Sequence, residues 1–269
     1  MRRPRLCPLF VRLTALCGFL PPSVCPSWGG AWLLPPGEGQ IITDALYSVS
    51  TWTFDSHGKL ISAPSYQKYE LSPYIEFGVT DWLTLVAAPA YDLVRTPTAG
   101  LSYTGVGQSE VAARLGLAYW ERAVLSMEVG LLSPGASLDS IGPLEVRRAA
   151  SLDVRGLAGR SFAVGDGMEG FVEMQAGYRF YAQQQPGEWR IDFTGGLRPF
   201  PWLLLLLQDF NVISYGWSQY GSVSWSKLQP GIVYDVSPQW SMQIGGFLTV
   251  AGVNAGREIG PLAAIWYRF

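Results

Sequence analysis

The sequence predicts an all-β protein, a transmembrane antiparallel up-and-down β-barrel of about 12 strands. Three observations lead to this fold class. Apolar and polar residues alternate with a period of two, the alternating runs are about 10 to 16 residues long, and tryptophans stand beside the short turns between runs. Strands of soluble proteins usually have about 5 or 6 residues, whereas a tilted membrane strand needs about 9 to 11. The length of the runs therefore favours a membrane barrel over a soluble sandwich.

The composition excludes several classes of protein. Only 15% of the 269 residues are charged and 13% are aromatic, against roughly 25% charged residues in a soluble domain. So little charge in a chain this apolar argues against disorder. A net charge of −2 is not the basic balance of a nucleic-acid binder. No stretch of about 18 uninterrupted apolar residues occurs, which excludes a helical membrane protein.

The first 29 residues have the layout of a secretory signal peptide. Four arginines in the first twelve residues precede a short apolar run over 13–20, and small residues near Ser27 and Gly29 offer a cleavage site. We expect residues 1–29 to be removed, residues 30–38 to form a periplasmic N-terminal segment, and residues 39–269 to form the barrel. An uncleaved anchor is the alternative interpretation.

All three cysteines lie in this leader, at Cys7, Cys17 and Cys25. The mature chain would then have none, which excludes a disulfide framework and a thiolate metal site. We expect no metal and no cofactor. The leader holds four arginines and no acid, so its removal changes the net charge from −2 to −6. An exported, cysteine-free, mildly acidic β protein fits the bacterial outer membrane, where we expect this chain to reside.

The alternation defines the strands. In residues 69–79 the odd positions are apolar and the even ones mostly polar, and residues 228–236 repeat the pattern Leu-x-Pro-x-Ile-x-aromatic-x-Val. Strands are expected near 39–54, 65–80, 82–95, 107–121, 122–133, 146–163, 168–182, 188–199, 202–214, 220–236, 240–253 and 259–269. An even number places the N- and C-termini on one side, the periplasmic one. Leu203 to Leu207 is apolar on both faces, so the pattern leaves its register open.

Short and longer connections alternate along the chain, as in bacterial barrels with short periplasmic turns. The longer ones are expected at 55–64, 96–105, 134–144, 183–187, 215–219 and 254–259. Aromatic side chains collect where hydrocarbon meets water. The expected membrane-interface aromatics beside the short turns and at the C-terminus are Trp82, Trp120, Trp202, Trp240, Tyr267 and Phe269.

The polar face of the strands is expected to line the lumen. The charged residues on this face are Lys68, Glu70, Glu76, Asp92, Glu110, Arg114, Glu128, Asp153, Arg155, Glu173, Arg179, Arg190, Asp192, Arg198, Lys227 and Asp235. Their signs are mixed, which leaves two interpretations open. One is a salt-bridged interior that braces the wall, and the other is a narrow polar channel for a small solute.

The sequence contains no convincing catalytic set. His57 is the one histidine, in the stretch Asp55-Ser56-His57-Gly58-Lys59 of an expected outer loop. A serine hydrolase would need a positioned serine and an orienting acid beside it, and adjacent loop residues do not predict that geometry. No zinc-protease, phosphate-binding or dinucleotide motif occurs. We therefore name no catalytic residue and expect that the protein is not an enzyme.

Two stretches resemble a known family. Gly30-Ala31-Trp32, followed by residues 36–40 (PGEGQ), resembles the start of the mature XagA-like bacterial proteins. Residues 74–85 (YIEFGVTDWLTL) resemble a hairpin of the phenol-degradation meta-pathway outer-membrane family, with Phe77 in the place of its tyrosine. The resemblance covers mainly residues 30–95 and, more loosely, the C-terminal hairpin. It implies an outer-membrane barrel that passes small, aromatic compounds, and it carries no catalytic residues over.

The expected function is passive transport of a small solute, with an aromatic or weakly apolar body, through a porin-like channel. The expected partners are outer-membrane lipids and lipopolysaccharide, a small-molecule solute, and the barrel assembly machinery, because the last strand ends on Phe269 like the C-terminal signature of outer-membrane proteins. No nucleic acid is expected. The alternatives are a closed structural barrel that presents its loops to a partner or surface polymer, an outer-membrane hydrolase and a soluble periplasmic barrel.

Overall fold

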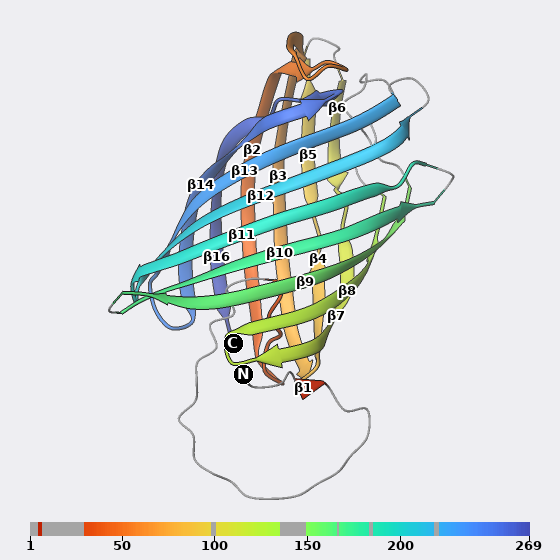
Figure 1. Ribbon diagram of the computed structural model, residues 1–269. Helices are drawn as coiled ribbons and strands as arrows, with labels where there is room; N and C mark the ends of the chain where they lie inside the picture. The colour runs from red at the N-terminus through yellow and green to blue at the C-terminus, as the bar shows by residue number, and fades with distance from the viewer. Residues whose placement is uncertain are drawn as a thin grey trace, which may run out of the picture.

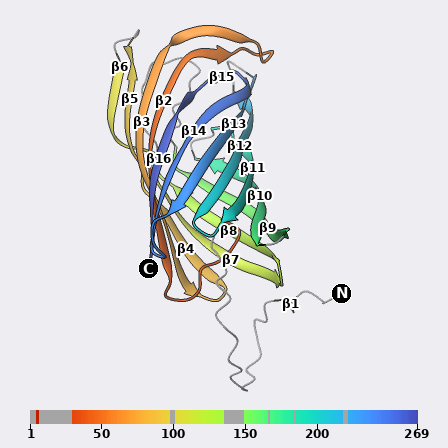
Figure 2. The ribbon, with the colours of Figure 1, turned by 90° about the vertical axis from the view of Figure 1, so that its left-hand side faces the viewer.

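The computed structural model describes residues 5–6, 30–97, 101–134, 149–165, 167–182, 185–217 and 221–269. These residues form one antiparallel β-barrel (Figures 1 and 2). The expected leader, apart from residues 5–6, and most of the loop expected at 134–144 lie outside the described residues. The described part of the chain contains no helix that is long and apolar enough to span a membrane.

Twelve strands make up the wall, and three of them are interrupted. The strands are β2 (Gly39–Phe54), β3 (Leu60–Thr80), β4 (Leu83–Ala88) continued by β5 (Tyr91–Thr96), β6 (Leu101–Val106) continued by β7 (Glu110–Trp120), β8 (Ala123–Leu132), β9 (Ser151–Val164), β10 (Met168–Tyr181), β11 (Glu188–Phe200), β12 (Leu203–Trp217), β13 (Gly221–Asp235), β14 (Trp240–Val253), and β15 (Ala255–Gly256) continued by β16 (Ile259–Arg268). A further two-residue strand, β1 (Arg5–Leu6), pairs with the end of β7 and is not one of the twelve.

Each strand pairs with its neighbours in the chain, and the last strand closes the barrel on the first. β16 runs antiparallel to β2, with Ala263 opposite Ala45 and Arg268 opposite Gln40. The short turns and Phe269 lie at one end of the barrel, the turn end, and the strand ends that flank the longer connections lie at the other, the loop end (Figure 1). The expected twelve-stranded up-and-down barrel is confirmed.

The strand bounds agree with the expected ones except near the loop end. The strand expected to begin at residue 65 begins at Leu60, because the loop expected over 55–64 is a short turn over residues 55–59. Similarly, Arg95 pairs with Ser102 inside the loop expected at 96–105, and β12 extends to Trp217, inside the loop expected at 215–219. The paired strands thus extend further toward the loop end than the alternation indicates.

The outer surface of the wall is apolar. Ile244, Leu131 and Val111 face outward with 67%, 61% and 60% of their surface exposed. The structure also shows which residues of the run Leu203–Leu207 face the lumen. Leu204 and Leu206 are buried inside, whereas Leu205 and Leu207 face outward. A continuous apolar face would be a severe liability in water, but it matches the band that a barrel presents to lipid.

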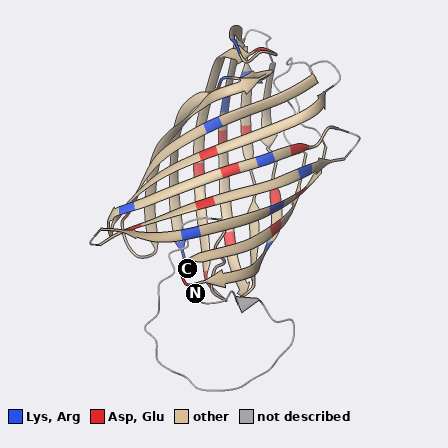
Figure 3. Ribbon diagram, viewed as in Figure 1, with Lys and Arg blue, Asp and Glu red and all other residues tan. Residues whose placement is uncertain are grey.

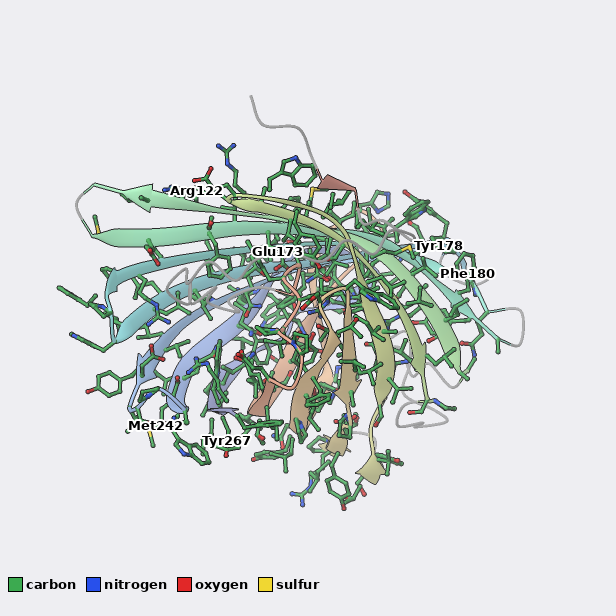
Figure 4. All side chains as sticks on the ribbon, turned by 90° about the horizontal axis from the view of Figure 1, so that it is seen from below. Arg122, Glu173, Tyr178, Phe180, Met242 and Tyr267 are labelled. Atoms are coloured by element: carbon green, nitrogen blue, oxygen red, sulfur yellow. The ribbon has the colours of Figure 1, made fainter. Side chains whose placement is uncertain are left out.

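Aromatic side chains gather at the turn end, as expected. Trp82, Trp120, Trp202 and Trp240 are each about half exposed. Trp202 stacks on Phe200, and Tyr267 packs between Trp240 and Phe269 with ring centroids 4.6 and 5.7 Å away. Seen from below, Tyr267 and Met242 lie at the perimeter of the barrel, whereas Glu173 lies inside it (Figure 4).

Candidate functional site

The lumen contains a piece of the chain itself. Residues 30–36, called the plug below, lie inside the barrel before the chain enters β2. The Ala31 N–H donates to Glu173 Oε2 at 2.9 Å, and the Ala31 carbonyl accepts from Ser126 Oγ at 2.8 Å. The Leu34 N–H donates to Thr84 Oγ1 at 3.1 Å. Side chains of β10, β8 and β4 therefore satisfy the backbone of the plug, which has no regular structure of its own.

Two glycines of the wall make room for the plug. A Cβ atom at Gly78 would lie 2.1 Å from the Pro35 carbonyl oxygen, and one at Gly159 would lie 2.5 Å from the Trp32 ring. Gly78 also exchanges backbone hydrogen bonds with Gly37 and Glu38, at 2.8 and 2.9 Å. Since such approaches are far inside van der Waals contact, only glycine fits at these two positions while the plug is in place.

Trp32 anchors the plug in a small apolar core. Its ring meets Phe171 edge to face, with centroids 5.9 Å apart. It packs against two buried clusters, one around Phe171, Leu204 and Trp266 and one around Val124 and Leu157. These inward-facing apolar residues explain why the lumen near the turn end is not polar throughout. They hold the plug by hydrophobic contact as well as by hydrogen bonds.

The inward-facing charges on one half of the wall form a continuous ladder of ion pairs. It runs from β3 through β7, β8, β9 and β10 to β11, and acidic and basic positions occupy neighbouring strands (Figure 3). In order of contact its members are Glu76, Arg114, Glu128, Arg155, Asp153, Arg179, Glu188 and Arg190. Four acids and four arginines alternate, so the ladder as a whole is neutral.

Arg114 is the most deeply buried member of the ladder. Its side chain is 1% exposed and lies between Glu76 and Glu128, at 2.6 and 2.7 Å. It also donates to the Tyr74 hydroxyl at 2.7 Å and to the Trp32 carbonyl at 3.3 Å. Arg114 thus joins the ladder to the plug, and its charge is fully compensated within a site that water barely reaches.

The basic side chains outside the ladder are also paired. Lys68 contacts Glu70 and Asp92, Lys227 lies 2.8 Å from Glu258, and Arg198 and Arg268 both approach Asp235. Every inward-facing arginine or lysine on the described strands therefore has a carboxylate within 4 Å. The balance is not symmetric, because the lumen holds more acids than bases.

Above the plug lies a cavity of about 530 Å³. Gly30 is part of its lining at the plug, and Gln108 and Leu132 belong to it toward the loop end. Binding sites for small molecules typically measure about 300–1,000 Å³, so a small organic solute fits. The cavity is lined by polar and charged groups on most sides, with Tyr74, Phe210 and Trp266 among them.

All sixteen charged residues expected in the lumen are buried or partly buried, and they share the inward register of their strands. Ten of them line the cavity: Glu70, Glu76, Glu110, Arg114, Glu128, Arg155, Glu173, Arg179, Arg190 and Asp192. Lys68, Asp92 and Asp153 stand behind these as ion-pair partners, whereas Arg198, Lys227 and Asp235 lie in separate pairs. Whether they form a solute path stays a prediction.

Sequence reasoning missed several inward-facing charges. These are Asp44, Glu188, Glu258 and Arg268. The sequence pattern does not reveal Asp44, because Ile42 and Leu46, its neighbours on the same face of β2, are apolar. The parity of the strand gave the available signal: Gln40, Asp44 and Ser48 share the buried register.

His57 lies in the exposed turn 55–59 at the loop end. Ser56 Oγ is 3.2 Å from its Nδ1, but Asp55 Oδ1 accepts the backbone N–H groups of His57 and Lys59, at 2.8 and 2.9 Å. These two hydrogen bonds lower the pKa of the Asp55 carboxyl below its usual value, and the one from the Lys59 N–H has the larger effect. Asp55 therefore shapes the turn and does not orient the imidazole. Within the described residues, no cluster of three or more His, Cys, Asp or Glu could hold a metal ion.

Comparisons with known proteins identify the fold. The chain is similar to the COG4313 outer membrane channel from Pseudomonas putida F1, with a TM-score of 0.67 and 14% identity over 90% of this chain and 98% of that one. This is the fold of bacterial outer-membrane β-barrels. The NanC porin gives a TM-score of 0.54 at 9% identity over 84% and 98% of the two chains. The translocator domain of the autotransporter NalP from Neisseria meningitidis gives 0.51 at 10% identity over 86% and 88%.

No protein-family model matches the chain, and no curated protein matches it. At 9–14% identity the structural likeness establishes the architecture alone. The neighbours support the expected outer-membrane barrel class and leave the narrower XagA-like and phenol-degradation resemblance as a hypothesis.

Proposed function

We propose that this protein is a bacterial outer-membrane channel for passive transport of a small solute. The observation that carries the proposal is the cavity of about 530 Å³ in the middle of the lumen, lined by ten of the inward-facing charges. A barrel with a purely structural role would gain no stability from an empty space among its buried charges. The channel and porin among the structural neighbours support the same function.

The plug sets the condition for transport. It closes the lumen on the turn-end side of the cavity, where Ala31 is fully buried and Leu34 is 6% exposed. A solute that enters the cavity from the loop end can leave at the turn end only when residues 30–36 move. We therefore propose a channel that rests in a closed state. Tyr74, Phe210 and Trp266 in the lining favour a solute with an aromatic or weakly apolar body.

We further propose that the turn end faces the periplasm and that the loop end meets lipopolysaccharide at the cell surface. Short turns on the periplasmic side are the rule for such barrels. Recognition of the last strand by the assembly machinery fits the position of Phe269. Its backbone exchanges hydrogen bonds with Gly39 at 2.8 and 3.0 Å, so the C-terminal residue completes the seam between first and last strand.

A closed structural barrel is the second candidate, because the plug and the ion-pair ladder together fill much of the lumen. It places function in the loops, and loss-of-function changes would then cluster in residues 55–64, 96–105 and 134–144. A hydrolase is the third candidate. It rests on Ser56 and His57, and replacement His57→Ala would abolish its activity.

The test is conductance of the mature chain. Protein beginning at Gly30 is refolded in detergent, its folding is verified by heat-modifiable gel mobility, and it is inserted into planar bilayers in several salts with small aromatic solutes added. We expect discrete openings that an added solute reduces. Folded protein that stays silent at all voltages, also after removal of the plug, would overturn the channel and favour the structural barrel.

A further inference from the structure

The lumen has an excess of carboxylates that its own cations do not neutralise. The acids on the inward face with no arginine or lysine of the described residues within 4 Å are Asp44, Glu110, Glu173 and Asp192. Every inward-facing base, by contrast, already has an acidic partner. Glu173 is occupied by the plug through Ala31 N–H and by the Gln175 amide. Of the others, Asp44, Glu110 and Asp192 line the cavity.

One part of this excess lies where β2, β3 and β16 meet. Asp44 lies opposite Ser72 on β3 and Ala264 on β16. Its diagonal inward neighbours on these two strands therefore include Glu70 and Trp266, a spacing at which side chains interact. Lys68 is the nearby base, and it is shared between Glu70 and Asp92. The wall thus carries three acids and one base, and the base contacts Glu70 and Asp92 but not Asp44.

A second, independent polar group on the same wall, the side chain of Gln40, lacks a hydrogen-bond donor. Gln40 precedes Asp44 on the inward face of β2, is 4% exposed and lines the cavity. Its Oε1 atom is buried and has no hydrogen-bond partner. An unpaired buried acceptor costs free energy unless a donor reaches it. An N–H group of a ligand would satisfy this amide oxygen, and Asp44 lies four positions further along the same face of β2.

The opposite wall, which carries the ladder, would not attract such a ligand. Three of the four arginines that line the cavity there, Arg114, Arg155 and Arg179, are held by carboxylates of the ladder at 2.6–2.9 Å, and a solute anion would have to displace these carboxylates. Arg190 is held less closely, because Glu188 lies 3.7 Å away and the buried Arg190 Nε atom has no hydrogen-bond partner among the described residues. The electrostatic asymmetry of the cavity therefore favours positive charge at the β2–β3–β16 wall.

Trp266 adds an aromatic surface to this wall. Its ring is 6% exposed, and its indole N–H donates to Gln243 Oε1 at 3.0 Å, which holds the ring in place in the lining. An indole face attracts cations as well as apolar groups, and the Arg268 guanidinium already lies over this ring, 5.6 Å from its centroid. Carboxylates, an unpaired amide oxygen and an indole together match an organic ammonium group on an apolar or aromatic body.

We propose that the cavity binds small organic cations through Asp44, Gln40 and Trp266, with the ammonium group beside Asp44. The role of this site in transport rests on the proposed channel function, whereas binding of the cation does not depend on it. It predicts that the open channel prefers cations to anions. It also narrows the solute class from aromatic or weakly apolar compounds to those that carry a protonated amine.

The binding test uses three probes of similar shape and different charge: benzylammonium, benzyl alcohol and benzoate. Titration calorimetry on the refolded mature protein should detect benzylammonium binding and little or no binding of the other two. Asp44→Asn should weaken benzylammonium binding about tenfold or more, because a charge-assisted contact is lost. Glu121→Gln removes the same charge from an exposed turn and should leave binding unchanged. Equal binding of benzoate, or an unaffected Asp44→Asn protein, would overturn the proposal.

The transport test measures reversal potentials across bilayers under a KCl gradient. We expect K⁺ to permeate in preference to Cl⁻, and Asp44→Asn combined with Asp192→Asn to bring the two permeabilities closer together. A conducting channel without cation preference would refute the inference and leave the proposed function standing. A silent protein that still binds benzylammonium would refute the channel and leave the cation site standing.

Discussion

The backbone N–H of Ala31 donates to the carboxylate of Glu173 at 2.9 Å, although the two residues are 142 positions apart in the chain. Through this contact a segment without secondary structure is fastened to the middle of β10. The same carboxylate has no arginine or lysine of the described strands within 4 Å, so the plug and the Gln175 amide supply its hydrogen bonds. One hydrogen bond thus holds the plug in the lumen and also provides a donor to a buried carboxylate.

Replacement Gly78→Ala should release the plug. The new Cβ atom would overlap the Pro35 carbonyl oxygen, a backbone atom that yields only if residues 34–37 move. We expect larger conductance or a higher open probability than wild type in planar bilayers. Gly156→Ala is the matched control, because nothing lies within 4 Å of a Cβ atom at that wall position. If the two variants conduct alike, the plug does not limit the channel.

Replacement Arg114→Met should destabilise the barrel. It leaves Glu76 and Glu128 buried without their shared cation, and breaking a buried pair in this way costs about 3–5 kcal/mol. Urea titration of the refolded protein, followed by tryptophan fluorescence, measures the loss. Arg160→Met, at an exposed position on β9, is the control and should change little. Adding Glu76→Gln to the first variant should recover part of the loss, and failure to do so would argue against the ladder.

Replacement Ile244→Arg tests the membrane-facing surface. Ile244 projects outward from β14 with 67% of its surface exposed, and an arginine near the bilayer midplane costs a transmembrane barrel about 2–4 kcal/mol. We expect a lower folded fraction in lipid vesicles, scored by heat-modifiable mobility, while Ile244→Leu folds like wild type. A soluble barrel would tolerate the arginine, so an unchanged yield would contradict the lipid-facing assignment.

Processing of the leader is expected to leave Gly30 as the first residue. A Cβ atom at Gly30 would lie 3.4 Å from Glu173 Oε1, so a new α-ammonium group would arise near that buried carboxylate. The intact mass of protein isolated from outer membranes should correspond to residues 30–269. The mass of the full chain would show that the leader remains.

Strand positions were predictable because the signal is local. Side chains of a strand alternate between its faces whatever its neighbours are, so the inward register of Glu76, Arg114 and Glu173 could be read directly from the sequence. Where both faces of a strand have the same polarity, the alternation does not show which residues point inward. The run Leu203–Leu207 was assigned to a face only by pairing with β13, which buries Leu204 and Leu206.

By itself, the sequence determined a twelve-stranded barrel with an apolar outside, a charged inside and aromatic residues at its turn end, since each follows from a period of two and from where the turns fall. The tertiary structure alone decided which charges meet. Partners such as Arg114 and Glu76 lie on different strands, and register and barrel closure set their separation. It also decided that residues 30–36 occupy the lumen, because their contacts with Glu173, Gly78 and Phe171 exist only once the wall has formed.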